Sequence, residues 1–122
     1  MNTRHAQTEK GRPVATPFQE LVTRRVQQDP EFAAALLEEA LERLVANDVV
    51  TAQLRLRDVV NGTIGFKALA GATGLMEKSL MRMLSAKGNP QAKNLFSIIH
   101  SLQQLNDVNL EITASPRAKS LG

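Results

Sequence analysis

Apolar side chains recur every three or four residues along most of the chain, which is the spacing of one face of an α-helix. Three such stripes occupy the first half of the sequence: Phe18, Leu21, Val22 and Val26 in the first, Phe32, Leu36, Leu37, Leu41, Leu44 and Val45 in the second, and Ala52, Leu56, Val59 and Val60 in the third. The pattern predicts helices within residues 16–105 and no extended sheet there.

Prolines and small polar residues mark where these helices begin. Thr16 and Pro17 form an N-cap threonine with a proline at the first helical position, and Gln19 is placed for a capping box. Asp29 and Pro30 repeat this signal before the second stripe. The local sequence therefore predicts one helix that follows a cap at Thr16 and a longer helix that follows a cap at Asp29.

The third stripe has its own start and stop signals. The second helix is predicted to end near Asn47, and Asp48 can cap the helix that follows. Asn61 and Gly62 come directly after the last apolar pair and tolerate a left-handed backbone, so we expect the third helix to end there. Residues 16–62 are thus predicted to be a helical N-terminal part.

Two short helical segments follow, separated by a tight turn. The first spans residues 66–72 and the second residues 77–84, and Gly74 between them is free to take a positive φ. Apolar residues of the two segments, Leu69 and Leu80, are expected to face one another across the turn. Two short amphipathic helices joined in this way are typical of a helix-turn-helix, whose second helix enters the major groove of DNA.

Beyond these segments the sequence predicts a loop, one more helix and a change of period. Asn89 and Pro90 are expected to cap and start the helix, which continues through Leu102. After it, apolar residues alternate with polar ones, as in a β-strand, at Val108, Leu110 and Ile112. This short C-terminal strand either pairs with the same segment of a second protomer or lies, as strand or coil, on its own subunit.

The two ends of the chain are predicted to be flexible. Residues 1–15 have few large apolar side chains and three Lys or Arg, so we expect a disordered basic tail. Residues 113–122 are expected to form a second flexible tail. Residues 63–112 are predicted to be the helix-turn-helix, DNA-binding part of the chain.

Composition limits the fold class and the kinds of catalytic or metal site that the chain can form. Sixteen Leu and fifteen Ala, against nine Val and four Ile, favour an all-α protein with an aliphatic core. The lack of Cys excludes thiol catalysis and thiolate zinc sites, and His5 and His100 are too few for a histidine-rich metal site. No nucleophile and base pair or phosphate-binding loop is visible, so we expect neither an enzyme nor a cofactor. Without an apolar run of membrane-spanning length or a secretory signal, we expect a cytoplasmic protein.

Charge is divided unevenly along the chain. Residues 29–58 hold seven acids and three bases, whereas residues 67–93 hold five bases and one acid. Scattered surface charge is one interpretation of this difference. The other is functional, because the basic segment is the one that carries the helix-turn-helix pattern.

The stretch LAGATGLMEKSLMRMLSAKGNP, with the helix and the short VNLEI segment that follow, resembles the helix-turn-helix of lambda-repressor and Cro proteins. More narrowly, residues 36–112 resemble the addiction-module antidote proteins, the HigA-like antitoxins of bacterial toxin–antitoxin pairs. In those proteins a GLxxxSLxxxLS core runs into GNP, and the matching residues here are Gly74, Leu75, Ser79, Leu80, Leu84, Ser85, Gly88, Asn89 and Pro90. The resemblance implies a lambda-repressor-like bundle, preceded by amphipathic helices, that binds operator DNA, represses its own operon and binds a toxin.

Two residues depart from the family pattern. Met76 stands where the recognition helix usually has a Ser or Thr cap, and it cannot accept the first amide hydrogen bonds. Met81 stands where the family often has a small polar or aromatic side chain. The start of this helix is therefore expected to be looser than usual, and base contacts need not carry over residue by residue.

The pitch of the second short helix indicates which side chains would face DNA. Leu80, Met83 and Leu84 must face inward, which leaves the opposite half of the helix for base contacts. The residues assigned to base readout are Glu77, Lys78, Ser79, Met81 and Arg82. The residues assigned to phosphate contacts are Lys67, Lys87, Asn89, Gln91 and Lys93.

Three kinds of partner are expected. Double-stranded operator DNA would be bound by a homodimer, because one helix-turn-helix reads only a few base pairs. A basic toxin of RelE or ParE type would bind the acidic helices of residues 29–58, unless these helices only support the DNA-binding half. The alternatives are a free-standing helix-turn-helix regulator without a toxin, or a protein-interaction module that no longer binds DNA.

Overall fold

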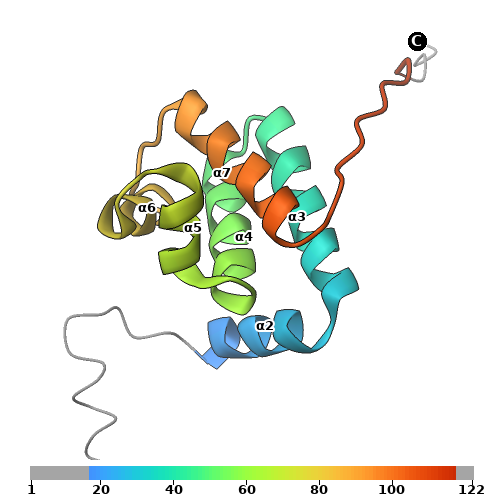
Figure 1. Cartoon of the computed structure of the whole chain (residues 1–122). Coiled ribbons are helices and arrows are strands. Elements are labelled where there is room, and N and C mark those ends of the chain that lie inside the picture. Colours follow the sequence, from blue (N-terminus) through green and yellow to red (C-terminus); the bar gives the residue numbers. More distant parts are fainter. Residues whose placement is uncertain (1–16, 118–122) are drawn as a thin grey trace, which may run out of the picture.

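The computed structural model describes residues 17–117, and within them the chain is all-helical, as predicted. The helices are α2 (Pro17–Gln28), α3 (Pro30–Val45), α4 (Val49–Gly62), α5 (Gly65–Thr73), α6 (Glu77–Met83) and α7 (Ala92–Leu105) (Figure 1). The proposed cap Thr16, the basic tail at residues 1–15 and the last five residues of the C-terminal tail lie outside the described residues. Among the described helices, none is long and apolar enough to cross a membrane.

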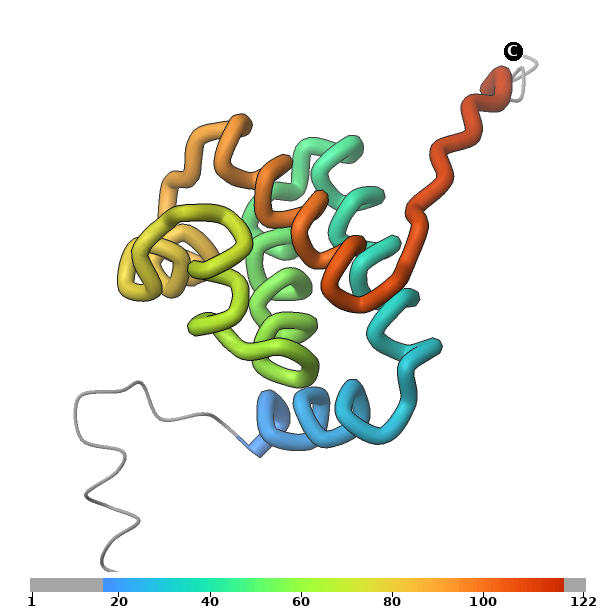
Figure 2. Tube along the Cα trace, in the orientation of Figure 1, coloured from blue at the N-terminus to red at the C-terminus, as the bar shows by residue number. Residues whose placement is uncertain are grey.

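The helices form one bundle around α4. Helices α3 and α4 run antiparallel and pack along their length, and α2 lies across the end of α4 (Figure 1). Helices α5 and α6 lie on one side of α4, and α7 crosses the bundle and packs against both α5 and α4 (Figure 2). Apart from Phe66, the buried core between them is aliphatic. Its most deeply buried members include Leu37, Leu56, Leu69, Leu80, Leu84, Ile98 and Leu102.

Of the three helix starts predicted in the first half of the chain, two lie in the described residues, and both are confirmed. The Asp29 carboxylate accepts hydrogen bonds from the amides of Glu31 and Phe32 at the start of α3. The Asp48 carboxylate accepts one from the Thr51 amide at the start of α4. Each cap satisfies amides that a helix end leaves without an intrahelical partner.

The first predicted stripe is only half buried. Val26 is in the core and Val22 packs against it, but Phe18 and Leu21 on the same helix are 68% and 60% exposed. The predicted stripe on α3 is also longer than the buried face of that helix, because Val45 at its end is exposed. The helical period placed these residues on the right helices, but of the stripe on α2 only Val22 and Val26 pack in the bundle.

Helix α4 ends at Gly62, as predicted, but the left-handed backbone predicted at Asn61 and Gly62 is wrong. Gly62 is still in α4, and the positive φ occurs at Gly65, the first residue of α5. Gly62 is instead needed for close packing, because a Cβ there would lie 2.5 Å from Val26 Cβ. A larger residue would force α2 away from α4.

The segment after α7 forms no strand in the described residues. Asp107 takes a positive φ and turns the chain, after which Val108 and Leu110 pack against the core. Gln103 accepts a hydrogen bond from the Leu110 amide through Oε1 at 3.0 Å. Residues 112–117 are exposed and lead away from the bundle (Figure 2). The segment thus lies as coil on its own subunit, and pairing with a second copy stays a prediction.

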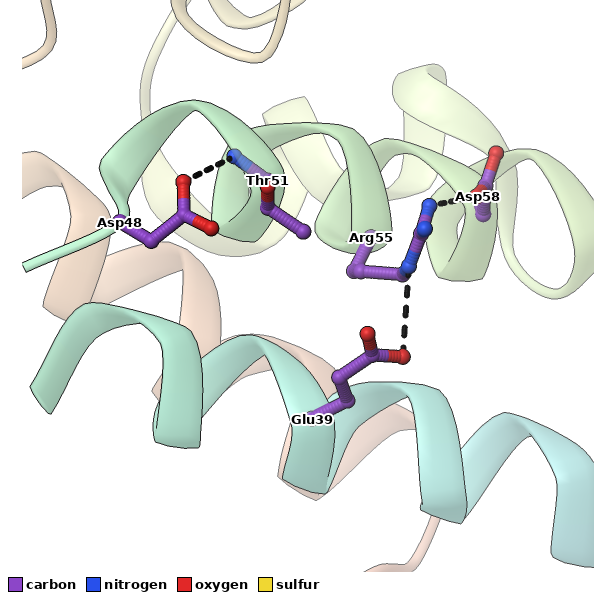
Figure 3. A network of polar contacts seen from close by, with 5 residues as sticks. All are labelled: Glu39, Asp48, Thr51, Arg55 and Asp58. Carbon is purple, nitrogen blue, oxygen red and sulfur yellow. Dashed lines mark hydrogen bonds and ion pairs between the residues drawn. The ribbon is translucent and has the colours of Figure 1, made fainter. Parts of the chain in front are cut away.

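An ion-pair network joins α3 to α4. Arg55 Nε lies 3.3 Å from Glu39 Oε1, and Arg55 Nη1 donates a hydrogen bond to Asp58 Oδ2 at 3.4 Å (Figure 3). Asp58 is only 8% exposed. Burial raises the pKa of the Asp58 carboxyl above its ordinary value, although the positive charges of Arg55 and Arg57 act in the opposite direction.

We expect Gly62→Ala to destabilise the protein by about 1–3 kcal/mol, because the new Cβ would collide with Val26. Gly71→Ala is the matched control, since a Cβ on Gly71, inside α5, would meet no atom within 4 Å, and there alanine should add about 0.5–1 kcal/mol of stability. Urea unfolding followed by circular dichroism measures both changes. Equal stability of the two variants would contradict the close packing of α2 on α4.

Asp58→Asn is expected to raise the melting temperature at about pH 7 and to leave it unchanged near pH 3. Because the pKa of Asp58 is higher in the folded protein than in the unfolded chain, the protonated carboxyl favours the folded state. This contribution to stability is complete below the unfolded pKa and is lost as the pH rises through the folded pKa. Glu39→Gln removes the half-exposed partner of Arg55 and should lower stability by less than about 1 kcal/mol. Thermal unfolding at about pH 7 and near pH 3 measures the melting temperatures of both variants. A lower melting temperature for Asp58→Asn at pH 7 would show that its pairing with Arg55 outweighs the cost of burial.

Candidate nucleic-acid interface

The turn between α5 and α6 has the geometry expected of a helix-turn-helix. Gly74 adopts a left-handed conformation with φ 78° and its amide donates to the Ala70 carbonyl at 2.9 Å, which closes α5. The Thr73 hydroxyl donates to the Leu69 carbonyl at 2.9 Å and accepts from the Leu75 amide at 3.2 Å. The turn is therefore held by its own backbone and by one side chain, and the predicted role of Gly74 is confirmed.

Helix α6 is oriented by its buried leucines. Leu80 and Leu84 have no exposed surface and belong to the same core as Leu69, with Met83 packed at its edge. The opposite half of the helix faces outward, and there Lys78, Met81 and Arg82 are exposed while Glu77 and Ser79 are half-buried. All five residues assigned to base readout lie on this one short helix, and three of them are exposed.

The start of α6 is open, as the sequence predicted. Met76 occupies the N-cap position with an extended backbone and no side-chain hydrogen bond, and it is 72% exposed. Its carbonyl accepts a hydrogen bond from the Leu80 amide, which closes the first turn. The first amides of α6 are therefore not satisfied by a cap side chain.

The predicted helix start at Asn89 and Pro90 is wrong. Helix α7 begins at Ala92 with Gln91 as its N-cap residue, and no side chain caps it. Residues 89–91 are not helical, and the Asn89 side chain forms no hydrogen bond within residues 17–117, so the cap that the local pattern predicted does not form. Lys93 nevertheless lies in the first turn of α7, where a cation can approach a phosphate.

The residues assigned to phosphate contacts lie on three parts of this region. Lys67 is in the first turn of α5, Lys87 and Asn89 are in the loop between α6 and α7, and Gln91 and Lys93 are at the start of α7. All five are exposed. Because no side chain caps α7, its first amides can donate hydrogen bonds to an anion from outside.

The five cations of residues 67–93 are exposed, and none of them forms an ion pair with another residue in the range 17–117. They are Lys67, Lys78, Arg82, Lys87 and Lys93. The ion pairs that the described residues do form involve Arg25 and Arg55, on α2 and α4. The cations around α6 can therefore bind a polyanion without first breaking internal pairs.

The sequence did not single out Gln53, and it gave Gly88 only as one residue of the family pattern. Gln53 is 1% exposed, and its Nε2 donates to the carbonyls of Met83, Ser85 and Gly88. Gly88 lies so close to the end of α6 that a Cβ there would collide with the Arg82 carbonyl. The only sequence signal for Gln53 is its place as an amide within the apolar stripe of α4, one turn before Leu56.

No protein-family model matches the sequence, and no curated protein and no solved structure matches the chain.

Proposed function

We propose that this protein is a sequence-specific DNA-binding transcriptional regulator that reads operator DNA with α6. The observation that carries the proposal is the outward face of α6. Buried Leu80 and Leu84 fix the helix against the bundle. Cations that form no ion pair within residues 17–117 lie on its exposed side and on both flanking segments. A short helix presented after a tight glycine turn is suited to the width of the major groove.

Each outward residue has a chemical role in this proposal. Arg82 and Lys78 donate hydrogen bonds to guanine, Glu77 accepts one from cytosine, and Met81 packs on a thymine methyl group. Ser79, at the edge of the face, can bind either base or phosphate. The exposed phosphate-binding set, Lys67, Lys87, Asn89, Gln91 and Lys93, fixes the register of the protein on the duplex without reading sequence.

A homodimer fits this function better than a single copy. Seven-residue α6 can reach only a few base pairs, and a single unit offers few phosphate contacts. Two copies on half-sites about one helical turn apart double both sets of contacts, which is the usual way to reach nanomolar affinity.

We further propose that the regulator is the antitoxin of a type II toxin–antitoxin pair. The specific observation is that α3 exposes Glu31, Glu38 and Glu42, while α2, which packs against α3, exposes Phe18 and Leu21. Exposed acidic side chains on α3 and exposed apolar ones on α2 suit a basic protein partner, since opposite charge speeds encounter and apolar contact supplies affinity. The resemblance of residues 36–112 to the antidote proteins supplies the kind of partner, a toxin of RelE or ParE type.

The DNA-binding proposal predicts different effects for two cations. Arg82→Ala should reduce the preference for a selected duplex over a scrambled one by about 1–3 kcal/mol, because it removes a base contact. Lys93→Ala should weaken binding to both duplexes alike and lower the salt slope by about one, because it removes a phosphate contact. Competition binding at several salt concentrations measures both effects.

The duplex for this test comes from selection of a random library by the wild-type protein. Arg24→Ala, which removes an exposed cation on α2, is the control and should change neither quantity. Equal losses for both duplexes in Arg82→Ala would place Arg82 on the phosphate backbone. A wild-type protein that selects no sequence and binds no duplex would refute the proposed function.

The antitoxin proposal predicts a stable complex with a small basic protein that is encoded by a gene next to this one. The double substitution Glu38→Lys and Glu42→Lys should weaken that complex by about tenfold or more, because it reverses charges facing a basic surface. Glu111→Lys, at an exposed position of the C-terminal segment, is the control and should have little effect. Co-purification and calorimetry provide the measurement. If DNA binding is found but the neighbouring protein stays unbound, the protein is a free-standing regulator.

A further inference from the structure

One buried amide holds the end of α6 and the loop after it against α4. Gln53 Nε2 lies 2.6 Å from the Met83 carbonyl, 3.1 Å from the Ser85 carbonyl and 3.3 Å from the Gly88 carbonyl. Met83 is the last residue of α6, and Gly88 ends the loop segment that precedes Asn89. A single side chain thus gathers three backbone carbonyls from a stretch of six residues.

The hydrogen-bond count explains why this position holds an amide. The Nε2 group has two hydrogens and faces three acceptors, so at least one hydrogen is shared. Carbonyls at the end of a helix have no intrahelical donor, and a buried carbonyl without a donor costs free energy. An apolar side chain at residue 53 would leave the Met83 and Gly88 carbonyls without this donor, whereas the Ser85 carbonyl would still accept a hydrogen bond from the Gly88 amide at 3.0 Å. A carboxylate at residue 53 would repel all three carbonyls.

The opposite end of α6 has no comparable restraint. Met76 provides no side-chain cap, and the helix is only seven residues long. Among the described residues, Gln53 is the only side chain from another helix with a hydrogen bond to the backbone of 83–88. The polar restraint on the direction of α6 is therefore concentrated at its C-terminal end.

Gly88 makes this arrangement possible. The loop folds back so closely on α6 that a Cβ at residue 88 would collide with the Arg82 carbonyl. This close return brings the Gly88 carbonyl within reach of the same amide that bonds Met83. The amide consequently couples the orientation of α6, which carries Arg82, to the position of the loop, which carries Lys87.

We propose that Gln53 is a positioning residue for DNA recognition, which sets the angle of α6 and of the following loop relative to α4. The proposal rests on the proposed function as a DNA-binding regulator. Base contacts depend on where Lys78 and Arg82 point, whereas long lysines contact phosphates over a range of backbone positions. Loss of the Gln53 hydrogen bonds should therefore reduce sequence discrimination more than general affinity for DNA.

The test compares Gln53→Met with wild type. Methionine has a similar size and shape but cannot donate a hydrogen bond to the three carbonyls. The probes are a duplex selected by the wild-type protein from a random library and a scrambled duplex of the same composition. We expect the preference for the selected duplex to fall by about tenfold or more, which is about 1.4 kcal/mol, and the affinity for the scrambled duplex to change by less than about threefold.

Gln103→Met is the matched control, because Gln103 is a half-buried glutamine that likewise holds a distant segment, through the Leu110 amide, but does not touch α6. It should leave both affinities unchanged. Gln53→Asn is a second variant, which keeps the amide on a shorter side chain that cannot reach all three carbonyls. It should show the same split between selected and scrambled duplexes, and it replaces Gln53→Met if that variant does not fold.

A measurement on the free protein separates this proposal from the proposed function. Residual dipolar couplings of amide N–H vectors report the direction of α6 relative to α3, α4 and α7. We expect α6 and the loop to reorient in the Gln53 variants while the other helices keep their relative directions, and we expect no change in Gln103→Met. Unchanged couplings in folded Gln53 variants would overturn the positioning role. A wild-type protein without DNA binding would overturn the proposed function, and the couplings would still decide whether Gln53 orients α6.

Discussion

The burial of the leucines between α5 and α6 determines which surface the molecule presents to a partner. Leu69, Leu80 and Leu84 have no exposed surface, and complete burial of each such side chain contributes about 1.5–3 kcal/mol. Helix α6 has only seven residues and could not persist as an isolated helix in water. It exists because one of its faces is packed, and the same packing directs Lys78 and Arg82 outward. Stability and presentation of this helix are therefore consequences of one set of contacts.

Sequence patterns predicted the features of the fold that depend on near neighbours. Asp29 and Asp48 bond to amides within three residues, and Gly74 needs only its own positive φ, so local chemistry was sufficient at these positions. The start of α7 was predicted wrongly, because Asn89 and Pro90 have the local cap pattern but Asn89 caps no amide, and the helix begins at Ala92. The burial predicted for the apolar face of α2 was only partly correct. Periodicity shows which face of a helix is apolar but not how much of that face a neighbouring helix covers.

The candidate interface was predictable to the same extent. Once Leu80 and Leu84 were placed inward, helical pitch placed Lys78, Met81 and Arg82 outward, and the structure has them there. The support behind the helix was not predictable, because the carbonyls that Gln53 binds lie 30–35 residues further along the chain. Backbone carbonyls have no sequence signature, so only the folded structure shows which of them a buried amide meets.

The ion pairs preserve in three dimensions the division of charge seen along the sequence. Arg55 is engaged by Glu39 and Asp58 within the acidic half, whereas the cations of residues 67–93 have no ion pair with any residue of 17–117. Salt screens isolated charges beyond about 8 Å, so a small anion would interact with one or two of these cations at a time. A duplex carries a charge every few ångströms and can engage several together, with release of its counterions. The exposed acids of α3 repel the same duplex. Under the proposed function, the charge division would favour an approach in which the side that carries α6 faces the duplex, because the cations of residues 67–93 gather there while the exposed acids lie on α3.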